Sequence, residues 1–271
     1  MTENLLTIAG YDPSGGAGAL LDLAVFESFG FRGLGVLTSV TAQNPARVAA
    51  VHHLPARILT GQYGALAGAF DFAGIKVGML GTAANLAAAA RILAGNPAVP
   101  RVVDPVLRSS SGALLLEKKA WPRILPLLRG RASLLTPNLD EASALSGFRV
   151  RTVEDMQAAA RSIQRTCLVP CLVKGGHLEG RPVDILFDGR TIRAFDHPRM
   201  RRDVHGTGCF LSSCILVFLA RRRPLEEACA RGIEWTSRAL RAAAPAPEGR
   251  RLMAPGRIRA RTKRGRRGPD R

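Results

Sequence analysis

The chain has 271 residues, of which 46% are hydrophobic and 5% aromatic, and its formal net charge is +18. This length allows one large core, so a single α/β domain is the simplest interpretation. The first ten residues lack the features of a secretory signal, and the longest apolar run, Cys209 to Ala220, is shorter than the roughly 20 residues of a membrane-spanning helix. We therefore expect a cytoplasmic protein without membrane contact.

Seven short β-type runs, most of them nearly all apolar, have the composition of buried strands: Leu5 to Ala9, Gly35 to Val40, Ile75 to Val77, Arg101 to Val103, Ser133 to Leu135, Cys171 to Val173 and Ile185 to Phe187. Strands covered on both faces show such unbroken apolar runs. Helical apolar spacing occurs in Leu20 to Phe29, Ala83 to Leu93 and Val153 to Ile163. This βαβ repetition predicts a mostly parallel sheet with a ligand crevice at the carboxyl ends of its strands.

The five cysteines form no CxxC pair. We expect four of them in the core, and the CxxxC spacing of Cys167 and Cys171 is a poor match to zinc sites.

The positive charge is concentrated at the end of the chain. Residues 250 to 271 hold ten basic residues and one acidic residue, which accounts for nine of the eighteen net charges. We place the domain boundary after Gly249, giving a folded domain over 1–249 and a basic, disordered tail over 250–271. The tail is either a solvated extension without a partner or a non-specific contact to nucleic acid or another polyanion.

His205-Gly206-Thr207-Gly208-Cys209 directly precedes the apolar run expected to form a helix. Backbone N–H groups of a first helical turn lack intrahelical partners, and glycines let that backbone approach a phosphate. The segment Gly206 to Cys209 therefore predicts an anion site suited to phosphoryl transfer. A glycine turn that merely caps a core helix is the alternative.

Cys209 falls in the first turn of that helix, where the dipole favours a thiolate and lowers the thiol pKa. A thiolate could accept the proton of an attacking hydroxyl. A buried, inert cysteine is the competing interpretation.

Further candidates follow other strands. Glu141 lies in the first turn of a helix after Thr136-Pro137-Asn138, and Asp104 ends a strand. Both carboxylates are suited to Mg²⁺, which takes one or two carboxylates plus phosphates. Lys174 could neutralise phosphate charge. The alternatives are a dipole-favoured Glu141 and a solvated Lys174. Neither GxxxxGK[ST] nor GxGxxG is present, so P-loop and dinucleotide-binding enzymes are disfavoured.

Taken together, the ordered motifs IAGYDPSGGAG, AQN, KVGML, VDPV, TPNLDEA, VKGGH and HGTGC resemble the hydroxymethylpyrimidine and phosphomethylpyrimidine kinases of thiamine biosynthesis, from about Leu5 to Ala243. The resemblance implies a ribokinase-like three-layer α/β/α sandwich and ATP- and Mg²⁺-dependent phosphorylation of a pyrimidine alcohol or its monophosphate. It leaves the formation of a homodimer open.

The resemblance also implies roles for individual residues. Asp22 and Gln43 match positions that hydrogen-bond the pyrimidine, Met79 matches an apolar ring contact, and Gly10 lies with them. The segment Gly206 to Cys209 matches the anion hole and catalytic cysteine. The nucleotide and metal residues that it implies are Lys174, Asn138, Asp104 and Glu141.

Two departures bear on substrate choice. Tyr11 stands where a smaller residue is common, and LRSSSGA (Leu107 to Ala113) replaces a run that often covers the substrate. A pyridoxal or pyridoxine kinase is therefore the alternative among enzymes. A catalytically silent, kinase-like protein with a polyanion-binding tail is the alternative from another class.

Overall fold

The computed structural model describes residues 2–109, 111–176, 178, 182–198, 204–246 and 251–257. Within these ranges, nine strands form one sheet in the order β3-β2-β1-β4-β5-β6-β7-β8-β9. The bounds of the strands are β1 (Asn4–Tyr11), β2 (Arg32–Gln43), β3 (Val48–His53), β4 (Gly74–Val77), β5 (Arg101–Val103), β6 (Leu134–Leu135), β7 (Cys171–Val173), β8 (Val183–Phe187) and β9 (Ile192–Asp196). All neighbouring pairs from β2 to β7 are parallel, and β3, β8 and β9 pair antiparallel.

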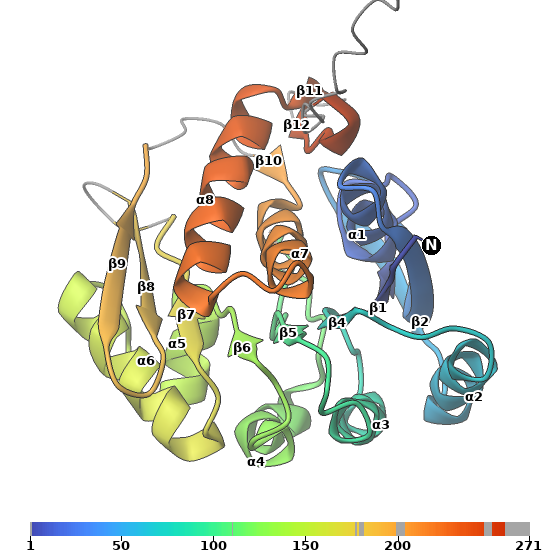
Figure 1. Cartoon of the computed structure of the whole chain (residues 1–271), viewed down its shortest axis with the longest axis horizontal. Helices are drawn as coiled ribbons and strands as arrows, with labels where there is room; N and C mark the ends of the chain where they lie inside the picture. The colour runs from blue at the N-terminus through green and yellow to red at the C-terminus, as the bar shows by residue number, and fades with distance from the viewer. Residues whose placement is uncertain are drawn as a thin grey trace, which may run out of the picture.

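Helices cover both faces of this sheet (Figure 1). One face carries α1 (Gly18–Ser28), α7 (Thr207–Ala220) and α8 (Leu225–Arg241). The other carries α2 (Ala56–Ala67), α3 (Ala83–Ala94), α4 (Ile124–Leu128), α5 (Leu139–Ser146) and α6 (Val153–Cys167), with the 3₁₀ helix η1 (Lys118–Arg123) before α4. The expected three-layer α/β/α architecture with a mostly parallel sheet is confirmed.

Two apolar cores lie on opposite sides of the sheet. Successive strand residues feed different cores: Leu5 packs with α1 and α7, whereas Leu6 packs with α2 and α3. Val102 and Val103 divide in the same way. This two-sided burial is the physical reason that the central strands are apolar without alternation.

All seven expected runs lie in strands, and the helical segments correspond to α1, α3, α6 and α7. The two outermost strands, β3 and β9, were not expected. Both are largely exposed, so neither carries the unbroken apolar run of a central strand. Four cysteines are buried, as expected, at Cys167, Cys171, Cys214 and Cys229.

The end of the domain differs from the expectation. A small sheet joins β10 (Val204–His205), β12 (Arg251–Leu252) and β11 (Ala244–Pro245), and η3 (Pro255–Arg257) follows it. Met253 is 4% exposed and packs into the core beneath α1, α7 and α8. Residues 251–257 therefore belong to the folded domain, because their apolar side chains are covered by it. The rest of the expected tail, residue 250 and residues 258–271, lies outside the described residues.

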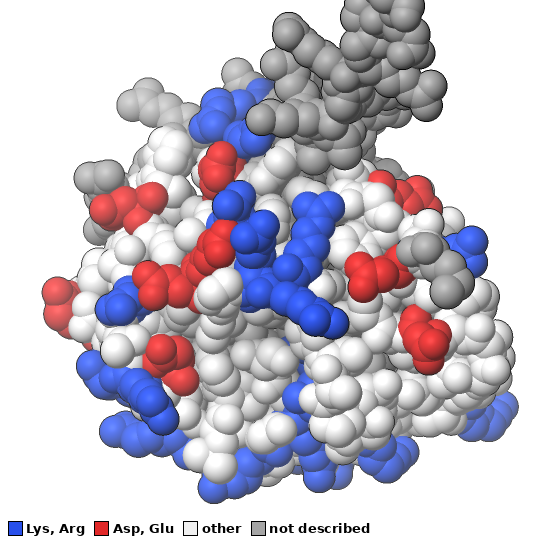
Figure 2. Space-filling model, in the orientation of Figure 1, with Lys and Arg blue, Asp and Glu red and all other residues white. Residues whose placement is uncertain are grey.

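On the face shown in Figure 2, Lys and Arg side chains gather near the middle and along the lower edge, and Asp and Glu side chains are scattered among and beside them. Within α8, the Glu227 carboxylate lies 2.7 Å from Arg231, and it lies 3.8 Å from Arg223, which precedes the helix. No helix in the described ranges combines the length and the apolar character needed to traverse a bilayer.

Candidate active site

The first turn of α7 is built around Gly206. This residue adopts φ 87°, and a Cβ there would lie 1.8 Å from the carbonyl oxygen of Gly16. Only glycine fits both the left-handed conformation and the close approach. No side chain caps the helix, and the hydroxyl of Thr207 donates instead to the carbonyl of Val204 at 2.9 Å. The N–H groups of the first turn, up to Cys209, are therefore left for an outside acceptor.

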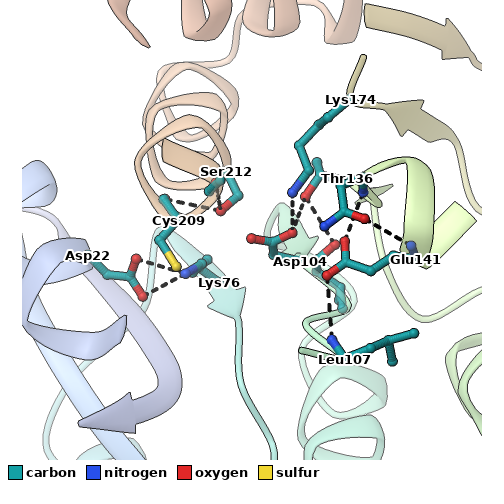
Figure 3. Close-up of polar contacts among 12 residues, drawn as sticks. Asp22, Lys76, Asp104, Leu107, Thr136, Glu141, Lys174, Cys209 and Ser212 are labelled. Carbon is teal, nitrogen blue, oxygen red and sulfur yellow. Dashed lines mark hydrogen bonds and ion pairs between the residues drawn. The ribbon is translucent and has the colours of Figure 1, made fainter. Parts of the chain in front are cut away.

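An ion pair faces this helix start (Figure 3). The ammonium of Lys174 lies 2.7 Å from Oδ1 of Asp104, and Thr136 contacts the same oxygen at 3.3 Å. A Cβ on Gly208 would lie 3.1 Å from Nζ of Lys174 and 3.4 Å from Oδ2 of Asp104. Because Gly208 has no side chain, the helix N–H groups and the ammonium border the same small volume, which we call the anion space. Such a space suits an anion.

Glu141 is 4% exposed and lies on the far side of Asp104. Its carboxylate accepts from the backbone N–H of Asn138 at 2.8 Å and of Leu107 at 3.4 Å. The Asn138 side chain accepts from the Glu141 N–H in return, which completes a capping box at α5. Burial raises the pKa of Glu141 to about 7, Lys174 opposes that shift, and Asp104 adds to it.

Asp104 and Glu141 supply two buried carboxylates next to the anion space. A small hard cation such as Mg²⁺ takes one or two carboxylates and completes its shell with phosphate oxygens and water. The donor set therefore fits a magnesium ion that arrives with a nucleotide. The described residues contain no cluster of three or more His, Cys, Asp or Glu side chains suited to a metal.

Lys76, in β4, is a site residue that sequence reasoning did not single out. Its ammonium lies 2.8 Å from both carboxylate oxygens of Asp22, and neither side chain is exposed. Burial alone would lower the pKa of Lys76, but the carboxylate of Asp22 outweighs it and the pKa is raised. A lysine within an otherwise apolar, fully buried strand was the signal available in the sequence.

This arrangement changes the expectation for Asp22. Its carboxylate accepts hydrogen bonds from Thr7 at 2.6 Å and Ser213 at 2.8 Å as well as from Lys76. The fully buried carboxylate is thus engaged by three protein side chains. These contacts favour a positioning role for Asp22 over the expected direct contact with the pyrimidine.

The thiol of Cys209 points toward the Lys76 ammonium (Figure 3). Burial raises the pKa of the Cys209 thiol, and Lys76 opposes the rise without reversing it. The expected lowering at the helix start is therefore wrong in its net direction, because desolvation of the thiolate outweighs the favourable charges.

The expected ring-binding residues lie at the ends of β1, β2 and β4. A Cβ on Gly10 would lie 2.6 Å from Sδ of Met79, so the glycine lets the two segments meet. Gln43 ends β2 and hydrogen-bonds Asp12, the first residue after β1. Burial would raise the pKa of Asp12, but hydrogen bonds from His205 and Gln43 lower it to about 2.

Asp12 also reaches the helix start. Its Oδ2 lies 2.9 Å from Nε2 of His205, the residue before Gly206. The pair joins two loops that are 193 residues apart. Both residues belong to motifs recognised in the sequence, but their contact could not be found there. His177 of the VKGGH motif and Ser110 lie outside the described residues.

A family model described as phosphomethylpyrimidine kinase matches residues 12–253. The hydroxymethylpyrimidine/phosphomethylpyrimidine kinase of Streptomyces coelicolor is 38% identical over 242 residues, covering 89% of this chain and 90% of that protein. The thiamine biosynthesis bifunctional protein ThiED of Geobacter sulfurreducens is 38% identical over 248 residues, and the chain spans about half (51%) of its length.

Two solved structures extend the likeness to the fold. A phosphomethylpyrimidine kinase from Clostridium difficile matches with a TM-score of 0.76 and 32% identity, covering 88% of this chain and 100% of that one. A pyridoxal kinase from Staphylococcus aureus in complex with AMP-PCP matches with a TM-score of 0.85 and 28% identity, covering 94% of each chain. The expected ribokinase-like fold is confirmed, and the chain belongs to the phosphomethylpyrimidine kinase family.

Proposed function

We propose that the chain transfers the γ-phosphoryl group of ATP to the hydroxymethyl group of 4-amino-5-hydroxymethyl-2-methylpyrimidine, and to the phosphate of its monophosphate, in thiamine biosynthesis. One observation carries the proposal. The uncapped start of α7 faces the Lys174–Asp104 pair across the space that Gly208 leaves open. This arrangement supports phosphoryl transfer because its donors are already aimed at one point.

In this mechanism the γ-phosphate lies at the first turn of α7. The N–H groups of Thr207, Gly208 and Cys209 donate to its non-bridging oxygens, where charge gathers during transfer. Lys174 adds an ammonium, and Asn138 lies beside it because the two residues form a β-bridge. A bound magnesium ion would supply neutralisation of phosphate charge. Asp104 and Glu141 are the residues that would hold it.

The substrate oxygen attacks phosphorus, the bond from the γ-phosphorus to the β-bridging oxygen breaks, and ADP leaves. The proton of the attacking hydroxyl passes to the thiolate form of Cys209, a form that becomes more populated as pH rises because burial raises the pKa of the thiol. Lys76 favours that thiolate, because its ammonium lies beside the thiol and is held by Asp22. We therefore assign Asp22 a positioning role. General-base assistance of this kind contributes about 10²- to 10⁴-fold.

The pyrimidine lies at the ends of β1, β2 and β4. Met79 and Gly10 offer an apolar contact to the ring, and Gln43 offers an amide that can both donate and accept. The hydrogen bond between Gln43 and Asp12 fixes the orientation of that amide.

The test is direct. Purified protein is incubated with Mg-ATP and the pyrimidine alcohol, its monophosphate or pyridoxal, and the products are identified by mass. Phosphorylated pyrimidine is expected in the first two reactions, and Cys209→Ala is expected to lose about 10²- to 10⁴-fold in turnover while it still binds ATP. Unchanged turnover in a folded Cys209→Ala protein would remove the thiolate from the mechanism.

A pyridoxal kinase is the second candidate. It is favoured by the similarity to the Staphylococcus aureus pyridoxal kinase that was solved in complex with pyridoxal, at a TM-score of 0.85 and 27% identity. A higher kcat/KM for pyridoxal than for the pyrimidine alcohol would establish that activity. Absence of product from all three substrates would favour a catalytically silent protein.

A further inference from the structure

The last described segment of the chain is attached to the start of α7. In β12, Arg251 pairs with Val204 and Leu252 pairs with His205, in parallel register. The same strand pairs antiparallel with β11, and the Arg251 guanidinium donates to the carbonyl of Ala243 at 3.1 Å. The residue that precedes the anion space is therefore held by a strand from the C-terminal end of the domain.

Leu252 also reaches the loop after β1. A Cβ built on Gly16 would lie 2.6 Å from Cδ2 of Leu252 and 2.6 Å from Cδ2 of His205. Both side chains therefore pack against the Gly16 backbone, and the Gly16 carbonyl oxygen lies close to Gly206. Met253 anchors the strand in the core.

We propose that residues 251–253 are a positioning element for the anion space. In this proposal, β12 holds His205 in place, and Leu252 packs against both His205 and Gly16. These contacts keep Asp12, Gly16 and Gly206 in one arrangement. None of these three C-terminal residues touches the reacting atoms. Their effect on catalysis rests on the proposed function. Their effect on the local stability of the Gly16 and Gly206 segments does not. Donors that are held in place before the reaction are the ones that accelerate it.

The experiment compares full-length variants without any ligand. Leu252→Ala removes the contact to Gly16, and Leu252→Met restores apolar volume. Leu225→Ala is the matched control, because Leu225 is likewise a partly buried leucine but packs against the core at the N-terminal end of α8, away from β12. Hydrogen–deuterium exchange is followed in two peptides, one that contains Ser14–Gly18 and one that contains His205–Phe210. They include the hydrogen-bonded N–H groups of Gly15 and Phe210. Thermal unfolding is recorded for each variant.

In Leu252→Ala, we expect exchange in both peptides to be on the order of tenfold faster, which corresponds to about 1.4 kcal/mol of local opening. Leu252→Met should return toward wild type, and Leu225→Ala should leave both peptides unchanged. Wild-type exchange in Leu252→Ala would overturn the proposal. Equal acceleration in Leu225→Ala would also overturn it, because the effect would then follow overall stability.

Kinetics provide the second readout. In Leu252→Ala, kcat should fall about tenfold with KM for the alcohol within about twofold, because the phosphate donors are displaced and the ring site is not. If wild-type protein phosphorylates none of the alcohols, the proposed function fails and the exchange experiment still decides the positioning role. If exchange is unaltered while wild-type protein is active, only the positioning role fails.

Discussion

Lys76 and Asp22 form an ion pair at 2.8 Å in which neither side chain is exposed to solvent. Removing one partner of such a pair leaves the other charge buried without compensation, which costs about 3 to 5 kcal/mol. Thr7 and Ser213 would lose their shared acceptor as well if Asp22 were replaced. Replacing either residue should therefore lower the stability of the sheet and also change the charge beside Cys209.

Lys76→Met and Asp22→Leu should each lower the free energy of unfolding by about 3 to 5 kcal/mol in urea denaturation. The double variant should cost less than the two single variants added together, since no charge is then stranded. Lys119→Met is the control, because Lys119 lies 3.2 Å from Glu117 at the surface and should change stability by less than about 1 kcal/mol. Strict additivity would argue against the pair as a unit.

The rate at which Cys209 reacts with an alkylating agent should go on increasing with pH above the ordinary pKa of a thiol. Burial raises the pKa of this thiol, so the neutral form persists to higher pH and the thiolate appears only above the usual thiol pKa. The rate of alkylation by iodoacetamide, followed by mass spectrometry, should therefore still be rising at pH 9. Cys209→Ser should remove the label, since the other four cysteines are buried. A plateau below pH 8 would instead indicate the low pKa that the helix start alone predicts.

Gly208→Ala should weaken nucleotide binding with little loss of stability. The new methyl group would lie 3.1 Å from Nζ of Lys174, in the space assigned to the phosphate. We expect KM for ATP to rise about tenfold, equivalent to about 1.4 kcal/mol, in steady-state assays. Gly64→Ala is the matched control, because Gly64 lies in α2 with open space around it and should stabilise the protein by about 0.4 to 1 kcal/mol. An unaltered KM for ATP in Gly208→Ala would show that the phosphate binds at another place.

The sequence was sufficient for the central sheet and for the residues at the ends of its strands. Val102 and Val103 are both apolar because both faces of β5 are covered. Parallel strands bring Asp104 and Lys174 to one edge of the sheet although 70 residues separate them. The outer strand β3 could not be predicted in this way, since half of its residues are exposed and none is buried.

The pairings of buried polar groups could not be predicted from the sequence. Nothing in its pattern joins Asp22 to Lys76, 54 positions away, and the resemblance favoured a ligand role for Asp22. The pKa of Cys209 was predicted from the helix start alone, although desolvation decides its direction. The C-terminal segment was judged by its charge, but Leu252 and Met253 are enough to attach it to the domain.

Glu141 should make the magnesium requirement depend on pH. Its pKa is raised to about 7, so the carboxyl group is largely protonated at pH 6 and largely ionised at pH 8, and only the ionised form binds a cation well. In wild-type protein, the Mg²⁺ concentration that gives half-maximal activity should therefore fall by about tenfold or less from pH 6 to pH 8. Glu141→Gln should need about tenfold more Mg²⁺ at pH 8 and show a weaker dependence on pH.

Glu154→Gln is the control, because Glu154 lies in the first turn of α6 and has no part in the proposed site. The same pH dependence in Glu141→Gln and in wild type would exclude Glu141 as the titrating group, and an unchanged Mg²⁺ requirement at pH 8 would exclude it as a ligand.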